Sequence, residues 1–140
     1  MTFRIEWSLD ESDGLVQESL LGDITLRDAE HRIEEHSIYL DSWLDALIRG
    51  AESVGAISGA AKIDIPEESQ PLLVHHGDGG EVTFSFRGEV VRAESVFELI
   101  SELRSASRLF LEKIRSLKDI EQNALVDSIR MYVAHRNSKQ

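Results

Sequence analysis

The fold is decided by the stretch SVFELISELRSASRLFLEKIRSL, residues 95–117, which contains the longest helix that the sequence predicts. Ser95 and Glu98 have the spacing of a capping box. In that motif the serine oxygen accepts a hydrogen bond from an orphan backbone N–H, and the glutamate reaches back to the N–H of the cap residue itself. One apolar stripe follows at helical spacing, formed by Val96, Leu99, Ile100, Leu103, Ala106, Phe110, Ile114 and Leu117. A helix that covers other elements with this stripe is therefore expected over residues 96–117.

A second helix is predicted over residues 40–54, where apolar positions recur at steps of three and four. Ser37 precedes it as an N-cap, and Gly55 follows its last apolar position as a C′ stop. Asp45 and Arg49 are four residues apart, so their side chains can pair on the helix surface. Gly50 indicates either an earlier end of this helix or a close packing contact.

Alternating apolar and polar residues predict strands before this helix. The first covers residues 3–7 and the second residues 20–26, with a short return strand around Ile33. Residues 10–14 are of types that favour turns, so they predict a turn between the first two strands. The chain thus begins as a β-meander.

The same alternation predicts strands after the helix, at residues 61–65, 71–76, 82–86 and 90–93. The glycine-rich residues 77–80 predict a hairpin turn, and Arg87-Gly88 predicts a second one. Pairing across the second turn would place Val91 and Ala93 on the same sheet face as Phe84 and Val82.

The segment beyond Leu117 predicts a bent or broken final helix, with Asp119 as a possible new cap. Its apolar face comprises Ile120, Leu125, Val126, Ile129, Tyr132 and Val133. The polar tail at 136–140 is expected to fray. Together the elements predict an α+β fold in one domain over 1–140, an antiparallel meander sheet covered on one face by helices, with a long C-terminal helix or helix pair.

The chain is strongly acidic, with 26 acidic against 15 basic residues and a formal net charge of −11. A surface of that sign repels the phosphates of nucleic acids and anionic lipid headgroups, so neither is expected as a partner. A cationic partner is compatible with this charge, whether a basic protein, a polyamine or a metal ion. Solubility alone also explains an acidic composition.

The chain has no cysteine, which excludes disulfides, thiolate nucleophiles and cysteine-based metal sites. Residues 1–7 alternate charged and apolar residues, unlike a signal peptide, and no apolar stretch approaches the length of a membrane span. Cytoplasmic residence is the resulting expectation.

Two histidine clusters are the candidates for chemistry. His75 and His76 lie beside Asp78, and imidazole with carboxylate suits zinc binding or general-base catalysis. Adjacent residues of a strand point to opposite faces, however, so both histidines cannot reach one ion without a bulge. His31 and His36 are five apart, which does not match a metallopeptidase helix. No metal site is expected at either cluster.

Other motifs also lack the spacing that their chemistry needs. Residues 77–80 have glycines but no following lysine, which argues against a phosphate-binding loop. Residues 10–14 place their glycine too early for a calcium loop. No serine stands in a nucleophile motif. We therefore assign no catalytic, cofactor-binding or metal-binding residue.

A non-enzymatic protein-binding module is the leading hypothesis for the function, of the type of a bacterial immunity protein or antitoxin that neutralises a cationic protein such as a nuclease toxin. One alternative is a homodimer or larger homo-oligomer that associates through the long C-terminal helix, where Leu103, Ala106 and Phe110 keep a near-heptad spacing. Another is a small enzyme with an unrecognised site. Its candidate residues would be His75, His76, Asp78 and Glu34.

Overall fold

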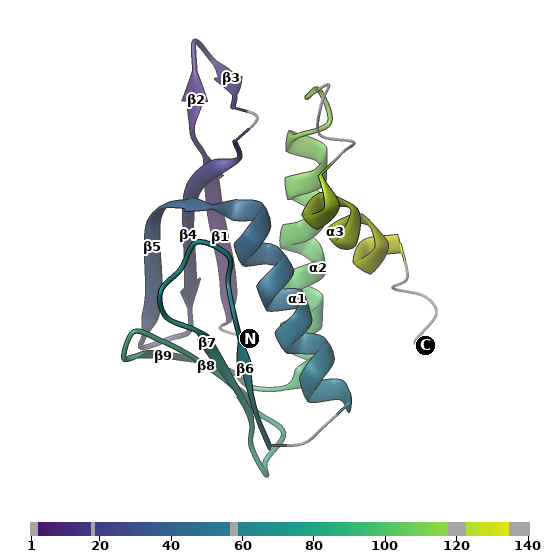
Figure 1. Ribbon diagram of the computed structural model, residues 1–140. Helices are drawn as coiled ribbons and strands as arrows, with labels where there is room; N and C mark the ends of the chain where they lie inside the picture. Colours follow the sequence, from purple (N-terminus) through teal and green to yellow (C-terminus); the bar gives the residue numbers. More distant parts are fainter. Residues whose placement is uncertain (1–2, 18, 57–58, 118–122, 135–140) are drawn as a thin grey trace.

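Two main antiparallel β-sheets, a small two-stranded hairpin and helices gathered on one side make up the described part of the protein, as its computed structural model shows (Figure 1). The structure describes residues 3–17, 19–56, 59–117 and 123–134. Along the chain, a β-meander is followed by a helix, a second β-meander and two more helices. The predicted α+β fold, with antiparallel strands and a helical cover, is confirmed.

The first sheet has the strand order β1-β4-β5. Its strands span Arg4–Leu9 (β1), Leu21–Arg27 (β4) and Arg32–Tyr39 (β5). Alternate residues of β4 are buried, which is the pattern of a sheet with one face against a hydrophobic core. The return strand predicted around Ile33 is confirmed and is eight residues long.

A small hairpin extends from the end of this sheet, between β1 and β4 (Figure 1). Its strands are Glu11–Ser12 (β2) and Leu15–Val16 (β3). Asp13 and Gly14 at its tip have φ values of 54° and 78°, as a two-residue hairpin turn requires. The predicted turn at 10–14 is therefore present, and its flanks pair with each other.

The second sheet has the strand order β6-β7-β8-β9. Its strands span Gly59–Ile63 (β6), Leu72–His76 (β7), Val82–Phe86 (β8) and Glu89–Ala93 (β9). The predicted register is confirmed, because Val82 lies opposite Ala93 and Phe84 lies opposite Val91. The chain therefore carries two successive meanders rather than one continuous sheet.

Asp28, in the turn between β4 and β5, joins the first sheet to the edge of the second. Its Oδ2 accepts a hydrogen bond from the Arg92 backbone N–H at 2.9 Å. Its Oδ1 accepts from the N–H groups of Glu30 and His31 at 2.8 and 2.7 Å. Burial acts to raise the pKa of Asp28, but these three hydrogen bonds favour the carboxylate and leave the pKa lowered.

The core between sheets and helices is tied together by aromatic contacts. Its ring pairs are Phe3–Phe84, Trp43–Phe86 and Trp7–Phe110, with centroids 6.0, 4.9 and 5.9 Å apart. Each pair joins residues from different parts of the chain, so the rings link both sheets to the helices.

The first helix, α1, spans Leu40–Ala56 and begins directly after β5. The prediction of Ser37 as its N-cap is wrong: Ser37 lies within β5 with φ 55°, and its N–H donates to the Asp23 carboxylate. The predicted stop at Gly55 is also wrong, because the helix continues through it. A left-handed glycine comes only at Gly59, with φ 109°.

The contacts of α1 test two further predictions, one on Gly50 and one on the pair of Asp45 and Arg49. A Cβ at Gly50 would lie 3.0 Å from Val74 Cγ2 on β7, so this glycine marks a close packing contact and not a helix end. The predicted pair on the helix surface is confirmed, with Arg49 Nε 3.0 Å from Asp45 Oδ2.

The second helix, α2, spans Val96–Lys113 and ends four residues earlier than predicted. Ser95 Oγ accepts a hydrogen bond from the Glu98 N–H at 3.0 Å, as expected for its cap. The other half of the predicted capping box is wrong, because Glu98 Oε1 accepts from the Glu94 N–H and not from that of Ser95. Glu98 is buried against β1, where its Oε2 accepts from the Phe3 N–H at 3.3 Å.

The last helix, α3, spans Ala124–Ala134 and is separate from α2, which confirms the predicted break. Asn123 caps it by accepting a hydrogen bond from the Val126 N–H, and its amide donates to the buried Asp41 of α1 at 3.0 Å. The proposed cap at Asp119 and the tail at 136–140 lie outside the described residues.

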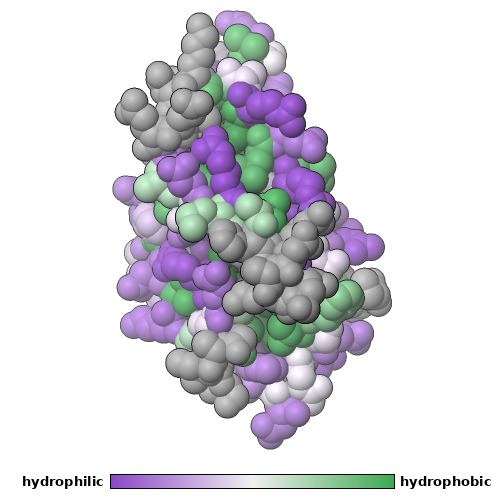
Figure 2. All heavy atoms as spheres, turned by 90° about the vertical axis from the view of Figure 1, so that its right-hand side faces the viewer, coloured by the Kyte–Doolittle hydropathy of each residue, from purple (hydrophilic) through white to green (hydrophobic). Residues whose placement is uncertain are grey.

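α3 packs across α1 and α2 on the side away from the sheets (Figure 1). On this face of the molecule, hydrophobic side chains form separate patches between hydrophilic ones (Figure 2). The helices therefore both cover the sheets and form part of the outer surface of the molecule.

Replacing Glu98 by alanine should lower the free energy of unfolding by about 2–3 kcal/mol, because two backbone N–H groups, one buried and one partly buried, lose their acceptor. Urea unfolding measures this change. Glu112→Ala is the matched control on an exposed turn of the same helix, with an expected change within about 0.5 kcal/mol. Equal stability of the two variants would contradict a structural role for Glu98.

Candidate functional site

A groove between the outer edge of β1 and the second half of α2 is the main candidate for a functional site. It is lined by Ile5, Glu6 and Trp7 from the strand and by Glu102, Ser105, Ala106, Leu109, Glu112 and Lys113 from the helix. Its volume is about 620 Å³, against about 400 Å³ for each of two other hollows, one on the second sheet and one between that sheet and the β4–β5 turn.

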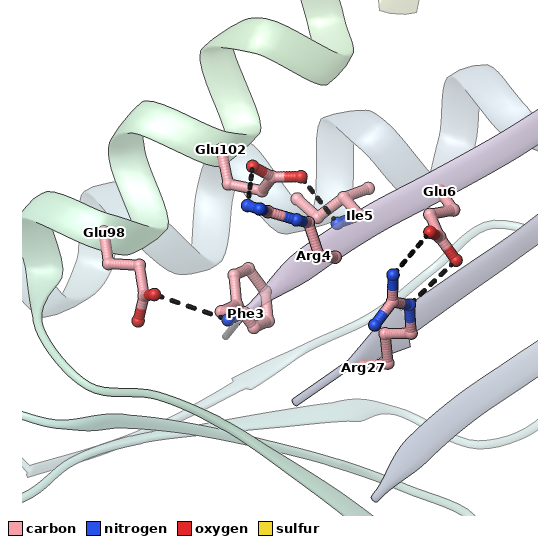
Figure 3. Close-up of polar contacts among 7 residues, drawn as sticks. All are labelled: Phe3, Arg4, Ile5, Glu6, Arg27, Glu98 and Glu102. Carbon is pink, nitrogen blue, oxygen red and sulfur yellow. Dashed lines mark hydrogen bonds and ion pairs between the residues drawn. The ribbon is translucent and has the colours of Figure 1, made fainter. Parts of the chain in front are cut away.

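Carboxylates of α2 occupy the first part of this strand edge (Figure 3). Glu98 accepts a hydrogen bond from the Phe3 N–H, and Glu102 Oε2 accepts one from the Ile5 N–H at 3.0 Å. The other oxygen of Glu102 lies 3.6 Å from Arg4 Nη1. These contacts satisfy two backbone donors that the sheet itself leaves unpaired.

The next donor along the edge belongs to Trp7. Backbone groups of alternate strand residues point to the same side, so the Trp7 N–H points away from β4, as do those of Phe3 and Ile5. The N–H groups of the even-numbered residues point the other way, toward β4, as the Asp10 N–H shows by donating to the carbonyl of Leu21, the first residue of β4. No hydrogen bond to the Trp7 N–H is found within the described residues. The edge is therefore open at Trp7.

Apolar side chains form the helical wall of the groove beside Trp7. The Trp7 indole is half-buried, donates to the Ala106 carbonyl at 3.2 Å and meets the Phe110 ring edge-on. Leu109, one turn of helix from Ser105, is 57 % exposed. An apolar side chain of a ligand would therefore find a contact surface here.

The charge of the groove is negative, because three carboxylates and one ammonium group line it. Glu6 forms a two-pronged contact with Arg27 at 3.0 and 2.9 Å, and this hydrogen bonding lowers the pKa of Glu6 (Figure 3). The single cation, Lys113, is 3.1 Å from Glu11 of the β2–β3 hairpin. Glu112, which is exposed, adds a further negative charge to the lining of the groove.

The two histidines beside the glycine-rich turn do not come together. His75 is exposed on the outer face of the second sheet opposite Thr83, whereas His76 is partly buried opposite Val82 on the inner face. This placement confirms the expected divergence of adjacent strand residues. Asp78 lies in the turn that follows.

The second histidine pair is separated as well. His31 and His36 are both exposed, and each lies beside its own aspartate, at 3.6 Å from Asp28 and 3.4 Å from Asp23. Glu34 is exposed on the outer face of β5, opposite Thr25. Within the described ranges, no group of three or more histidines or carboxylates is arranged to hold a metal ion.

A pair of carboxylates that sequence reasoning missed lies near the N-terminal half of α1. Burial and the nearby Glu68 raise the pKa of Glu35, and Arg87, 4.0 Å away, acts in the opposite direction. Glu68 itself accepts a hydrogen bond from the Trp43 indole at 3.2 Å. In a chain with 26 acidic residues, no local signal separates this pair from the others.

Comparison of the chain with known protein families, curated proteins and solved structures finds no match in any of the three. None of the helices in the described part of the chain is long and apolar enough to cross a membrane.

Glu35 gives a pH-dependent prediction. A carboxyl whose pKa is raised on folding contributes stability below its unfolded pKa, and that contribution is lost as pH rises through the folded value. Glu35→Gln cannot ionise, so its free energy of unfolding should rise relative to that of the wild type between about pH 4 and pH 7.

Urea unfolding at both pH values tests this, with Glu34→Gln as the control on an exposed position of the same strand. A difference between wild type and Glu35→Gln that stays constant or falls with pH would show that burial does not control this carboxyl.

Proposed function

We propose that this chain is a non-enzymatic protein-binding module whose partner is a basic protein, of the kind that a bacterial immunity protein or antitoxin neutralises. The observation that carries the proposal is the groove between β1 and α2. There an open strand edge at Trp7, an exposed apolar side chain at Leu109 and a surplus of carboxylates meet in one place. These three features suit a polypeptide ligand with cationic side chains.

Charge supports the same partner at long range. With a net charge of −11, the chain attracts a basic protein and speeds its diffusional encounter. Within the groove, Glu6 and Glu102 already face Arg27 and Arg4, so the local attraction at the contact itself comes mainly from Glu112. A basic partner thus meets complementary charge both on approach and when bound.

The alternatives have weaker support in the structure. The enzyme hypothesis names His75, His76, Asp78 and Glu34 as candidates. His75 and His76 face opposite sides of β7, and Glu34 is exposed on β5 in the other sheet.

The homo-oligomer hypothesis rests on the spacing of Leu103, Ala106 and Phe110, but all three are buried in the core of the single chain. The exposed Phe97 and Leu109 of α2 could serve in their place, although two copies would bring like charges together. A single domain over residues 1–140 and cytoplasmic residence stay predictions of the sequence.

A matched pair of α2 variants tests the proposal. Leu109→Arg places a large cation in the groove, and Phe97→Arg makes the same change of charge at a residue that is 76 % exposed and does not line it. Immobilised wild type and Phe97→Arg should retain a basic protein from an extract of the source organism. Retention by Leu109→Arg should fall about tenfold or more, which corresponds to about 1.4 kcal/mol.

Quantitative mass spectrometry of the retained proteins provides the measurement, and circular dichroism checks that both variants are folded. Retention of only acidic proteins, or equal retention by the two variants, would refute the proposed contact surface.

A further inference from the structure

We infer that the partner inserts an extended basic segment into the groove, where it adds to the first sheet as a strand beside β1 and pairs with the backbone at Trp7. This inference rests on the proposed function and specifies the segment of the partner that the site recognises.

The backbone of β1 determines where pairing can begin. β1 is the outermost strand of its sheet, and the donors of Phe3 and Ile5 are already bonded to Glu98 and Glu102. Glu102 therefore ends any added ladder on one side, at Ile5. The Trp7 N–H, about 7 Å further along the strand, is the first donor that an added strand can reach.

Side chains around the edge determine the residue pattern of the added strand. Its side chains would alternate between the helical side, next to Trp7 and Leu109, and the outer face of the sheet, next to Glu6. The first position favours an apolar residue, and the second favours lysine or arginine. A segment that alternates apolar and basic residues thus fits both sides of the groove.

Charge also argues against a second copy of this chain as the occupant. Pairing of two β1 edges would bring two acidic grooves together, each with Glu6, Glu102 and Glu112, on chains that each carry a net charge of −11. Like charges at such short range oppose association. A cationic segment of another protein gains energy from the same carboxylates.

Synthetic peptides test the inference on the full chain. The probe is an octapeptide of alternating valine and lysine, titrated into isotope-labelled protein and followed by NMR. Two further forms carry backbone N-methyl groups, one on every valine and the other on every lysine. N–H groups of neighbouring residues face opposite edges of a strand, so all valine N–H groups point to one edge and all lysine N–H groups to the other, and only one form should lose pairing with β1.

The parent peptide should shift the Trp7 amide resonance and show nuclear Overhauser contacts to it. One N-methylated form should bind at least about tenfold more weakly, as the loss of backbone hydrogen bonds in a desolvated site implies, and the other should bind like the parent. Which form loses affinity reports whether the added strand is parallel or antiparallel.

Three results would overturn strand addition. They are equal binding of both N-methylated forms, no effect of the parent peptide at Trp7, and a dimer of the free protein in which β1 pairs with β1 in sedimentation and NMR. After either of the first two results, the proposed function would still hold if Leu109→Arg reduced the retention of a basic protein. The proposed function itself would fail only if the wild type retained no basic protein or if Leu109→Arg and Phe97→Arg retained it equally.

Discussion

The hydrogen bond from the Phe3 N–H to the carboxylate of Glu98 is the contact on which the arrangement of β1 and α2 depends. It joins residues 95 positions apart, and the bond from Ile5 to Glu102 one helical turn later spans 97. A strand at the edge of a sheet has donors that need acceptors, and α2 supplies two from one face. The same face carries the apolar stripe that covers the core.

This arrangement also explains why the candidate site lies where it does. The carboxylates protect the strand at Phe3 and Ile5, and the protection stops where α2 presents Ala106 and Leu109 in place of glutamates. An edge that is capped at one end and open at the other restricts pairing to a short, defined stretch. Such restriction favours recognition of one segment over general aggregation.

Much of the fold could be predicted from the sequence because its signals are local. The cap at Ser95, the glycine-rich turn at 77–80 and the register across Arg87-Gly88 each depend on a few adjacent residues, and each is confirmed. Ser37 and Gly55 failed as helix boundaries, because Ser37 belongs to β5 with a positive φ and α1 continues through Gly55. The partner of Glu98 could not be predicted, since it is a backbone group from the other end of the chain.

The groove escaped prediction for the same reason. Alternation in residues 3–7 indicates a strand but not whether that strand lies at an edge, and the stripe on α2 does not reveal which strand it flanks. Hydrogen exchange of the free protein tests the resulting account most directly. The Phe3 and Ile5 amides should exchange at least about 100-fold more slowly than the Trp7 amide, for which the described part of the chain offers no acceptor. A Trp7 amide as protected as that of Ile5 would contradict the open edge.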